Sequence, residues 1–132
     1  MRLLPDTHLL VWWAGFEAGA SSPLPMIAGE LMDDETNHIY FSAASIWEVA
    51  IKSALGRDDF VVDPGRLRRG LLDSGYEELA VTGEHAVGVA KLPLLHMDPF
   101  DRILITQATI EGLTLLTSDA KVAAYAGPIR RV

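Results

Sequence analysis

The chain contains no cysteine, which excludes disulfide bonds, thiolate metal sites and a cysteine nucleophile. It has no apolar run long enough to span a bilayer. The amino terminus also lacks the basic start and the long apolar stretch of a secretory signal. We therefore expect a cytoplasmic protein that makes no membrane contact.

Positive charge is scarce as well. Lysine and arginine number 11 against 18 aspartate and glutamate residues, which gives a formal net charge of −7. This balance argues against a sequence-independent nucleic-acid binder, because such proteins neutralise phosphates with lysine and arginine. It does not exclude an enzyme that acts on nucleic acid, since bound divalent cations can invert the local potential.

What the sequence does contain is an alternation of strand-like and helix-like segments. Hydrophobic residues make up 49% and charged residues 22% of the 132 residues, as in ordinary globular proteins, and the length suits one domain over residues 1–132. The patterns predict strands at 2–4, 38–42, 78–81, 113–117 and 129–132. They predict helices at 7–13, 26–32, 44–55, 82–91, 98–111 and 119–125, and one that Pro64 opens and Gly75 ends.

Strands that alternate with helices pair in parallel through right-handed crossovers. The expected fold class is therefore α/β, a three-layer α/β/α sandwich around a five-stranded parallel sheet. Pro5 is an irregularity, because its missing N–H would remove a ladder bond from a strand expected at the centre of the sheet. We interpret it as the end of that strand.

Four carboxylates lie where predicted strands end or predicted helices begin: Asp6, Glu48, Asp101 and Asp119. In an open α/β sheet, both kinds of position face one crevice beyond the carboxyl ends of the strands. Acids gathered there repel one another unless protons or cations neutralise them. An all-oxygen site suits Mg²⁺ or Mn²⁺, and converging helix N-termini favour phosphate, so the pattern indicates metal-dependent phosphodiester chemistry.

Each acid also has a purely structural explanation. Glu48 could form a capping box with Ser45 or pair with Lys52 at helical spacing. Asp6 and Asp119 could simply cap the helices that follow them. The order of strands and helices nevertheless sends these acids to one edge of the sheet, which favours a shared site.

The local strings around the acids are similar to those of a known family. DTHLLVWW, SAASIWEVAIKSALGR, HMDPFDRILITQA and LLTSDAKVAAY together resemble the PIN-domain family, specifically the VapC-type toxins of toxin–antitoxin pairs. The likeness runs through nearly the whole chain. It implies a metal-dependent ribonuclease with an α/β/α sandwich, which is inhibited by a small partner antitoxin and is often a homodimer.

The resemblance also assigns roles to residues. It places the catalytic and metal-binding acids at Asp6, Glu48, Asp101 and Asp119. Asp98 matches a less central acid, which we expect mainly to cap the helix that contains Asp101. Pro5 stands where the family generally has an aliphatic residue, and this departure bears on the position of Asp6.

Several neighbouring residues could assist the acids. Thr7 and Ser118 could hydrogen-bond a ligated water or a phosphate, although each is also an ordinary first-turn polar residue. Arg102 could contact a carboxylate or the substrate, or form a structural ion pair. His8 and His96 flank the site and could assist proton transfer or be structural.

The tryptophans could stack on bases or serve packing. Trp47 lies in a helix expected to be mostly buried, so we interpret it as a core residue. Trp12 and Trp13 are better placed for a protein interface, where tryptophan is enriched.

The leading hypothesis is an endoribonuclease toxin that hydrolyses RNA with one or two Mg²⁺ or Mn²⁺ ions. Its expected partners are RNA, a cognate antitoxin whose basic tail could enter the acidic crevice, and a second copy of the chain. One alternative is a catalytically inactive PIN-like domain that only binds a partner. Another is a receiver-type phospho-acceptor domain, which needs an aspartate at the end of the third strand, where the chain has Ala80 and Val81.

Overall fold

All five strands run parallel in one sheet, with the spatial order β3-β2-β1-β4-β5. The computed structural model describes residues 1–19 and 21–132. The strands are β1 (Arg2–Pro5), β2 (His38–Ser42), β3 (Glu77–Leu79), β4 (Thr114–Thr117) and β5 (Ile129–Arg131). The parallel sheet predicted from the alternation of segments is therefore confirmed.

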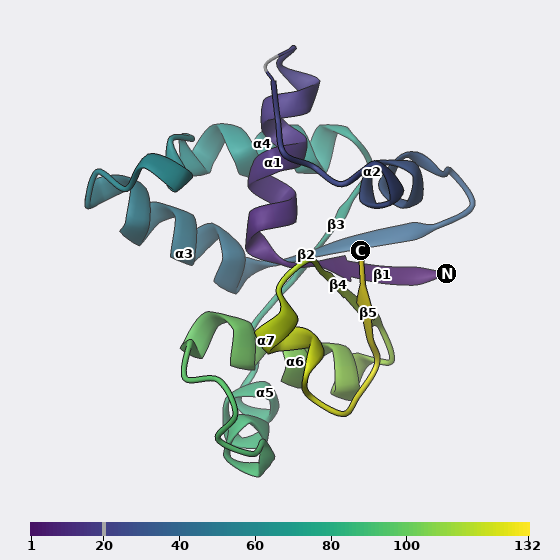
Figure 1. Cartoon of the computed structure of the whole chain (residues 1–132), viewed down its shortest axis with the longest axis vertical. Helices are drawn as coiled ribbons and strands as arrows, with labels where there is room; N and C mark the ends of the chain where they lie inside the picture. The colour runs from purple at the N-terminus through teal and green to yellow at the C-terminus, as the bar shows by residue number, and fades with distance from the viewer. Residues whose placement is uncertain (20) are drawn as a thin grey trace.

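Helices cover both faces of this sheet (Figure 1). One side carries α1 (Thr7–Glu17), α2 (Met26–Asp33), α3 (Ala43–Ala54) and α4 (Pro64–Asp73). The other carries α5 (Gly83–Gly88), α6 (Pro99–Glu111) and α7 (Ala120–Ala123). Two short 3₁₀ turns, Asp58–Phe60 and Val89–Lys91, follow α3 and α5. The predicted α/β/α sandwich is confirmed.

The strands separate two hydrophobic cores because their side chains alternate between the faces. Leu3 and Leu116 are buried with α1 to α4, whereas their chain neighbours Leu4 and Leu115 are buried with α6 and α7. This period of two is the geometric property of extended chain. Apolar residues on both faces identify β1 and β4 as central strands, as their places in the sheet show.

The predicted boundaries agree best where the apolar pattern is sharpest. The strand predicted at 38–42 is observed as His38–Ser42. The third strand lies at Glu77–Leu79 instead of 78–81, and the first helix continues to Glu17 instead of ending at residue 13. The helix predicted at 82–91 ends at Gly88 and continues as a 3₁₀ turn. No described helix has the length and apolar character that a membrane crossing needs.

Pro5 ends β1 without disturbing the sheet. The pairing of β1 with β2 stops at Leu3 and Ile39, whereas pairing with β4 continues to Pro5 and Leu116. The backbone N–H of Asp6 then donates to the Leu116 carbonyl at 2.9 Å. Successive N–H groups point to opposite sides of a strand, so the nitrogen of Pro5 faces β2 beyond the last paired residues. The missing donor therefore lies on the side where the pairing with β2 ends, and Asp6 is held in line with β4.

The packing of the core between the sheet and α1 to α4 can be tested with Leu3→Ala. Leu3 is fully buried in the central strand β1. Truncating a buried leucine costs about 2–5 kcal/mol, because burial is lost and a cavity remains. We expect that decrease in the free energy of unfolding measured by urea denaturation. Leu94→Ala, at a side chain 75% exposed, should change it far less. Equal losses for the two variants would contradict this packing.

Candidate metal centre

The candidate site lies at the carboxyl edge of the sheet, between β1 and β4. The chain passes from β1 to β2 and β3 on one side, and then returns to place β4 and β5 on the other. A reversal of this kind leaves a crevice beyond the carboxyl ends of the two strands that flank it. Asp6 directly follows β1 and Asp119 comes two residues after β4, so both acids lie at this crevice.

Asp6 is buried at the start of α1, with 4% of its surface exposed. One carboxylate oxygen caps the helix by accepting from Leu9 N at 3.0 Å, and the other accepts from Thr117 Oγ1 at 2.6 Å. Burial raises the pKa of Asp6 above its usual range, and the charge of Asp119 adds to the rise, while the hydrogen bonds oppose it. The capping role expected for Asp6 and its place at the crevice are thus both realised.

Thr117 links the two acids that follow β1 and β4. Its hydroxyl donates to Asp6 and accepts from the backbone N–H of Asp119 at 3.0 Å. Asp119 itself is exposed and caps α7 by accepting from Lys121 N. Ser118, the polar residue expected to assist, is half-buried and makes no side-chain hydrogen bond within the described part of the chain.

Glu48 reaches the crevice from α3 and is 3% exposed. Ser42 caps this helix, so the capping box considered for Ser45 and Glu48 is not formed. The alternative pairing is present, because Lys52 Nζ donates to Glu48 Oε2. The other carboxylate oxygen, Oε1, is buried without a hydrogen-bond partner. A buried oxygen of this kind costs free energy, and a bound cation would remove that cost.

Asp101 lies in the first turn of α6, which Asp98 caps as expected by accepting from two backbone N–H groups. His96 Nε2 is 2.8 Å from Asp101 Oδ2. Burial raises the pKa of Asp101 to about 6, and the charges of Asp98, Asp6 and Glu48 act in the same direction against the His96 hydrogen bond. Acids from α1, α3 and α6 therefore share one electrostatic environment.

The loop that carries His96 is held by Arg102. This guanidinium is buried, with 8% of the residue exposed, and donates to the Pro93 carbonyl and to Tyr125 Oη, each at 2.9 Å. Tyr125 Oη in turn bonds both the N–H and the carbonyl of His96. Arg102 forms no ion pair within residues 1–19 and 21–132, so the structural salt bridge considered for it is absent. Through these hydrogen bonds, Arg102 holds the loop that carries His96 in place.

Thr7 also has a positioning contact. Its hydroxyl donates to Ser45 Oγ at 2.9 Å in a buried environment. This bond ties the start of α1, which follows Asp6, to the helix that carries Glu48. His8 points elsewhere, with Nε2 3.4 Å from Asp59 Oδ2.

The expectations for Trp13 and Trp47 are wrong. Trp13 is 6% exposed and belongs to the core, whereas Trp47 is 63% exposed. Trp47 lies edge-on to Phe100 with ring centroids 5.4 Å apart. These two residues immediately precede Glu48 and Asp101 in the chain, so an exposed aromatic pair borders the acids.

Sequence reasoning missed Thr117, which contacts Asp6. It could have been found, because it follows Leu116, the β4 residue that pairs with Pro5 next to Asp6. His96, which the sequence places beside the site, contacts Asp101, whereas His8 does not. The structure places one potential ligand atom each of His96, Asp98 and Asp101 within 4.8 Å of one another.

The donor set fits a hard divalent cation. Carboxylate oxygens are the preferred ligands of Mg²⁺ and Mn²⁺, and the crevice gathers them from separate segments. Glu48 Oε1 is buried without a hydrogen-bond partner, and burial raises the pKa of Asp101, so a further positive charge would be favourable beside both carboxylates. The group of potential ligand atoms within 4.8 Å of one another, from His96, Asp98 and Asp101, does not include Asp6, Glu48 or Asp119.

Comparison with known proteins places these features in context. The sequence model of the PIN domain matches residues 3–128. The crystal structure of VapBC2 from Rickettsia felis, bound to a DNA fragment from their promoter, superposes with a TM-score of 0.70 at 14% identity and covers 99% of this chain and 98% of that chain. A domain of a functionally unknown protein from Methanocaldococcus jannaschii gives a TM-score of 0.59 at 16% identity, covering 99% and 90%. No curated protein sequence matches significantly.

The raised pKa of Asp101 predicts how metal-free stability depends on pH. The pKa of Asp101 is raised to about 6 in the folded chain, above the value of about 3.9 expected for an unfolded aspartate. The resulting contribution to stability is complete below about pH 4 and is lost as the pH rises through about 6. Asp101→Asn should therefore be more stable than wild type by roughly 3 kcal/mol well above that range, and by little below it.

Urea denaturation in the presence of a chelator measures this difference. The asparagine oxygen can still accept from His96, so the main change is the lost charge. Asp73→Asn, at an exposed carboxylate of α4, serves as the charge-matched control. A pH-independent difference between wild type and Asp101→Asn would contradict the raised pKa of Asp101.

Metal addition should stabilise the folded protein by mass action. An ion at 100 times its dissociation constant adds about 2.7 kcal/mol to the free energy of unfolding. We expect millimolar Mn²⁺ or Mg²⁺ to raise the melting temperature of wild type and to raise that of Glu48→Gln much less. Glu30→Gln, an exposed glutamate on α2, should respond like wild type. An absent shift, or the same shift in Glu48→Gln, would argue against the site.

Proposed function

The chain belongs to the PIN-domain family, and on this premise we propose that it is a metal-dependent endoribonuclease, the toxin of a toxin–antitoxin pair. The observation that carries the proposal is the buried carboxylate Glu48, whose Oε1 is unpartnered in a crevice shared with Asp6 and Asp101. Structural capping explains why Asp6 and Asp119 are at their helix ends. It does not explain a buried glutamate oxygen that has no hydrogen-bond partner.

The proposed reaction is hydrolysis of an RNA phosphodiester bond. We assign one or two Mg²⁺ or Mn²⁺ ions to Asp6, Glu48, Asp101 and Asp119. A bound divalent cation supplies charge that polarises a phosphoryl oxygen and makes water a better nucleophile. A carboxylate that remains free of the ion can orient this water or accept its proton.

The surrounding residues hold the acids in place. Thr117 fixes Asp6, Lys52 fixes one oxygen of Glu48, and His96 fixes one oxygen of Asp101. The N-termini of α1 and α6 meet at the same edge, where their backbone N–H groups favour a phosphate. Such preorganisation lowers the cost of assembling the charged site during the reaction.

The surface next to the acids is suited to a single-stranded nucleic acid. Trp47 is exposed and packs against Phe100 beside the crevice. Aromatic rings stack on bases without strong sequence preference. Lys52 Nζ lies 5.8 Å from the centre of the Phe100 ring, so one positive charge borders this aromatic pair.

The proposed partners are an antitoxin and a second subunit, in the cytoplasm. One of the similar structures is a VapBC complex, which supports an antitoxin partner. Trp47 and Ile51 of α3 and Leu55, which follows the helix, are exposed at 63%, 37% and 74% and form an apolar face that a partner could cover. A basic antitoxin tail would complement the acidic crevice.

The alternatives are less well supported. A partner-binding module without catalysis would not need a buried glutamate oxygen left unpaired. A receiver-type phospho-acceptor is disfavoured because β3 ends at Leu79 with no aspartate at its carboxyl end.

RNA cleavage tests the proposed function directly. Wild type should degrade single-stranded RNA with Mg²⁺ or Mn²⁺ and not with a chelator. Asp101→Asn and Asp119→Asn should each reduce the rate by at least about 100-fold, as is common when a group acts in the transition state. Asp73→Asn, exposed and outside the crevice, should cleave like wild type.

Melting temperatures of all the variants confirm that they are folded. If wild type and both crevice variants degrade RNA equally, a contaminating nuclease is responsible and the assignment is wrong. If folded wild type binds metal without cleaving any RNA tested, the partner-binding alternative replaces the ribonuclease.

A further inference from the structure

A histidine lies beside the carboxylates at the start of α6. One potential ligand atom each of His96, Asp98 and Asp101 lies within 4.8 Å of the others, and we call these residues the His96 triad. Within residues 1–19 and 21–132, no other three histidine or acidic side chains meet in this way. Asp101 also belongs to the four acids assigned to the metal centre, so the His96 triad borders the same crevice.

The ligand atoms of the His96 triad are open to an ion. The side chains of His96 and Asp101 keep 14% and 18% of their surface exposed, and Asp98 is half-buried. Capping of α6 uses Asp98 Oδ1, which accepts from the backbone N–H groups of Phe100 and Asp101. The contact of Asp101 with His96 uses Oδ2. Each aspartate therefore has a second oxygen that no hydrogen bond within the described part of the chain engages.

The contact between His96 and Asp101 already has the spacing of two neighbouring metal ligands. His96 Nε2 is 2.8 Å from Asp101 Oδ2. Ligand atoms that lie about 2.1 Å from an ion and at right angles to each other are about 3 Å apart. An ion can thus replace the proton between these two atoms. The imidazole then carries its proton on Nδ1, which no hydrogen bond engages among the described residues.

Buried neighbours hold this histidine in place without a metal. Tyr125 Oη bonds both the N–H and the carbonyl of His96, and Arg102 donates to the same carbonyl and to Tyr125 Oη. Tyr125 and Arg102 are both buried. A ligand whose backbone is already fixed loses little conformational entropy when an ion binds.

A nitrogen donor changes which ion a site prefers. Mg²⁺ takes oxygen ligands and keeps several waters, whereas imidazole suits first-row transition ions. Mn²⁺ binds carboxylates as Mg²⁺ does, and it accepts an imidazole nitrogen more readily. Two aspartates with one histidine therefore favour Mn²⁺ over Mg²⁺.

We propose that His96, Asp98 and Asp101 together ligate a first-row transition ion, so that the metal centre prefers Mn²⁺ to Mg²⁺. The histidine ligand deepens the proposed function, on which it rests for the presence of a metal centre, by naming the ion that the centre selects. Metal binding is measured without RNA, so the histidine ligand and the ribonuclease activity can fail separately.

Electron spin-echo envelope modulation of the full chain loaded with Mn²⁺ tests for the nitrogen ligand. A coordinated imidazole produces nitrogen modulation of the Mn²⁺ signal, and isotopic labelling of histidine alters this modulation. We expect it in wild type and expect its loss in His96→Gln. His8→Gln and His38→Gln should keep it.

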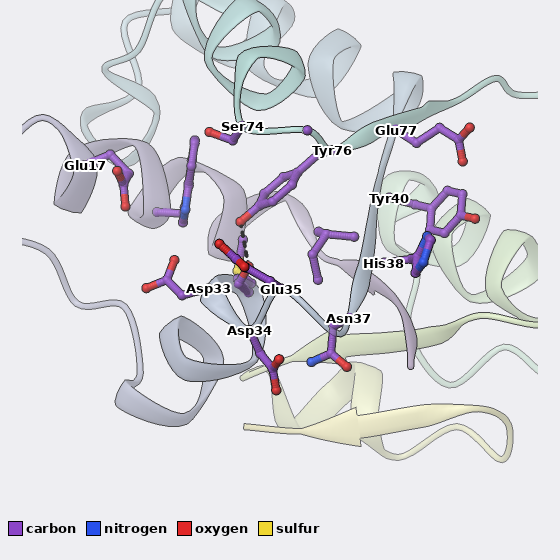
Figure 2. Close-up of a pocket in the computed structure, with 14 residues that line it drawn as sticks. Glu17, Asp33, Asp34, Glu35, Asn37, His38, Tyr40, Ser74, Tyr76 and Glu77 are labelled. Carbon is purple, nitrogen blue, oxygen red and sulfur yellow. Dashed lines mark hydrogen bonds between the residues drawn. The ribbon is translucent and has the colours of Figure 1, made fainter.

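His38 is a demanding control because it also lies among carboxylates. It lines a pocket of about 580 Å³ at the amino ends of β2 and β3, together with Asp33, Glu35 and Glu77 (Figure 2). Mn²⁺ held only by the negative charge of the surface would respond to His38→Gln as much as to His96→Gln.

Calorimetric titration tests the preference for Mn²⁺. His96→Gln should weaken Mn²⁺ binding about tenfold or more, and Mg²⁺ binding less than about threefold. Asp98→Asn should weaken binding of both ions, because it removes a charged ligand but keeps the helix cap, which asparagine also forms. Asp63→Asn makes the same change at the cap of α4 and should leave both affinities unchanged. Melting temperatures in a chelator show that the variants are folded.

Three results would overturn the proposal. Absent nitrogen modulation in Mn²⁺-loaded wild type would show that His96 only hydrogen-bonds Asp101. Equal losses of Mn²⁺ and Mg²⁺ affinity in His96→Gln would show that the histidine acts only by positioning Asp101. Modulation that persists in His96→Gln would assign the nitrogen to another residue.

RNA cleavage separates the histidine ligand from the proposed function. Wild type that cleaves RNA with Mg²⁺ but shows no nitrogen modulation would leave the ribonuclease standing and remove the histidine ligand. Wild type that cleaves no RNA, but whose modulation is lost in His96→Gln, would support the histidine ligand and contradict the ribonuclease.

Discussion

The burial of several carboxylates close to one another is the constraint around which the carboxyl edge of the sheet is built. Asp6 and Glu48 are almost fully buried, and Asp101 is held nearby. The protein gives each of them one neighbouring group, in Thr117, Lys52 and His96 respectively. Lys52 also supplies a charge that balances Glu48. Glu48 Oε1 keeps no hydrogen-bond partner and is available to a cation.

The position of these carboxylates also explains why one aspartate can both cap a helix and serve as a candidate metal ligand. An N-cap uses one oxygen of an aspartate and leaves the other free. Asp6 caps α1 with one oxygen and receives Thr117 with the other. The N-termini of α1, α3, α5 and α7 also lie at the carboxyl edge because each of these helices begins within a few residues of the end of a strand. Capping therefore delivers Asp6 and Asp119 to the crevice as a consequence of topology.

Local patterns in the sequence were sufficient to predict the parallel sheet and the helix caps. The strand His38–Ser42, the cap Asp98 and the parallel order all follow from residue types and spacing. The sequence could not show that the His96 loop folds back onto Asp101, because that contact depends on Arg102 and Tyr125 meeting beneath it.

The burial predicted for Trp47 was wrong for a related reason. Apolar residues occupy more than one side of α3, and only the packing of neighbouring helices decides which side is covered. Val49 is fully buried in that helix, whereas Trp47 and Leu55 are exposed. A hydrophobic pattern predicts that a helix packs on something, and leaves open whether the second apolar side meets the same chain or another molecule.

The alternation of side chains in β1 has a consequence for how the sheet can be misassembled. Sliding β1 along β4 by one residue would exchange the faces of Leu3 and Leu4 and expose each core to the wrong helices. Sliding it by two would preserve the faces, but it would carry Asp6 away from Thr117, whose hydroxyl donates to Asp6 at 2.6 Å. That hydrogen bond therefore favours the native register over the one slippage that side-chain alternation tolerates.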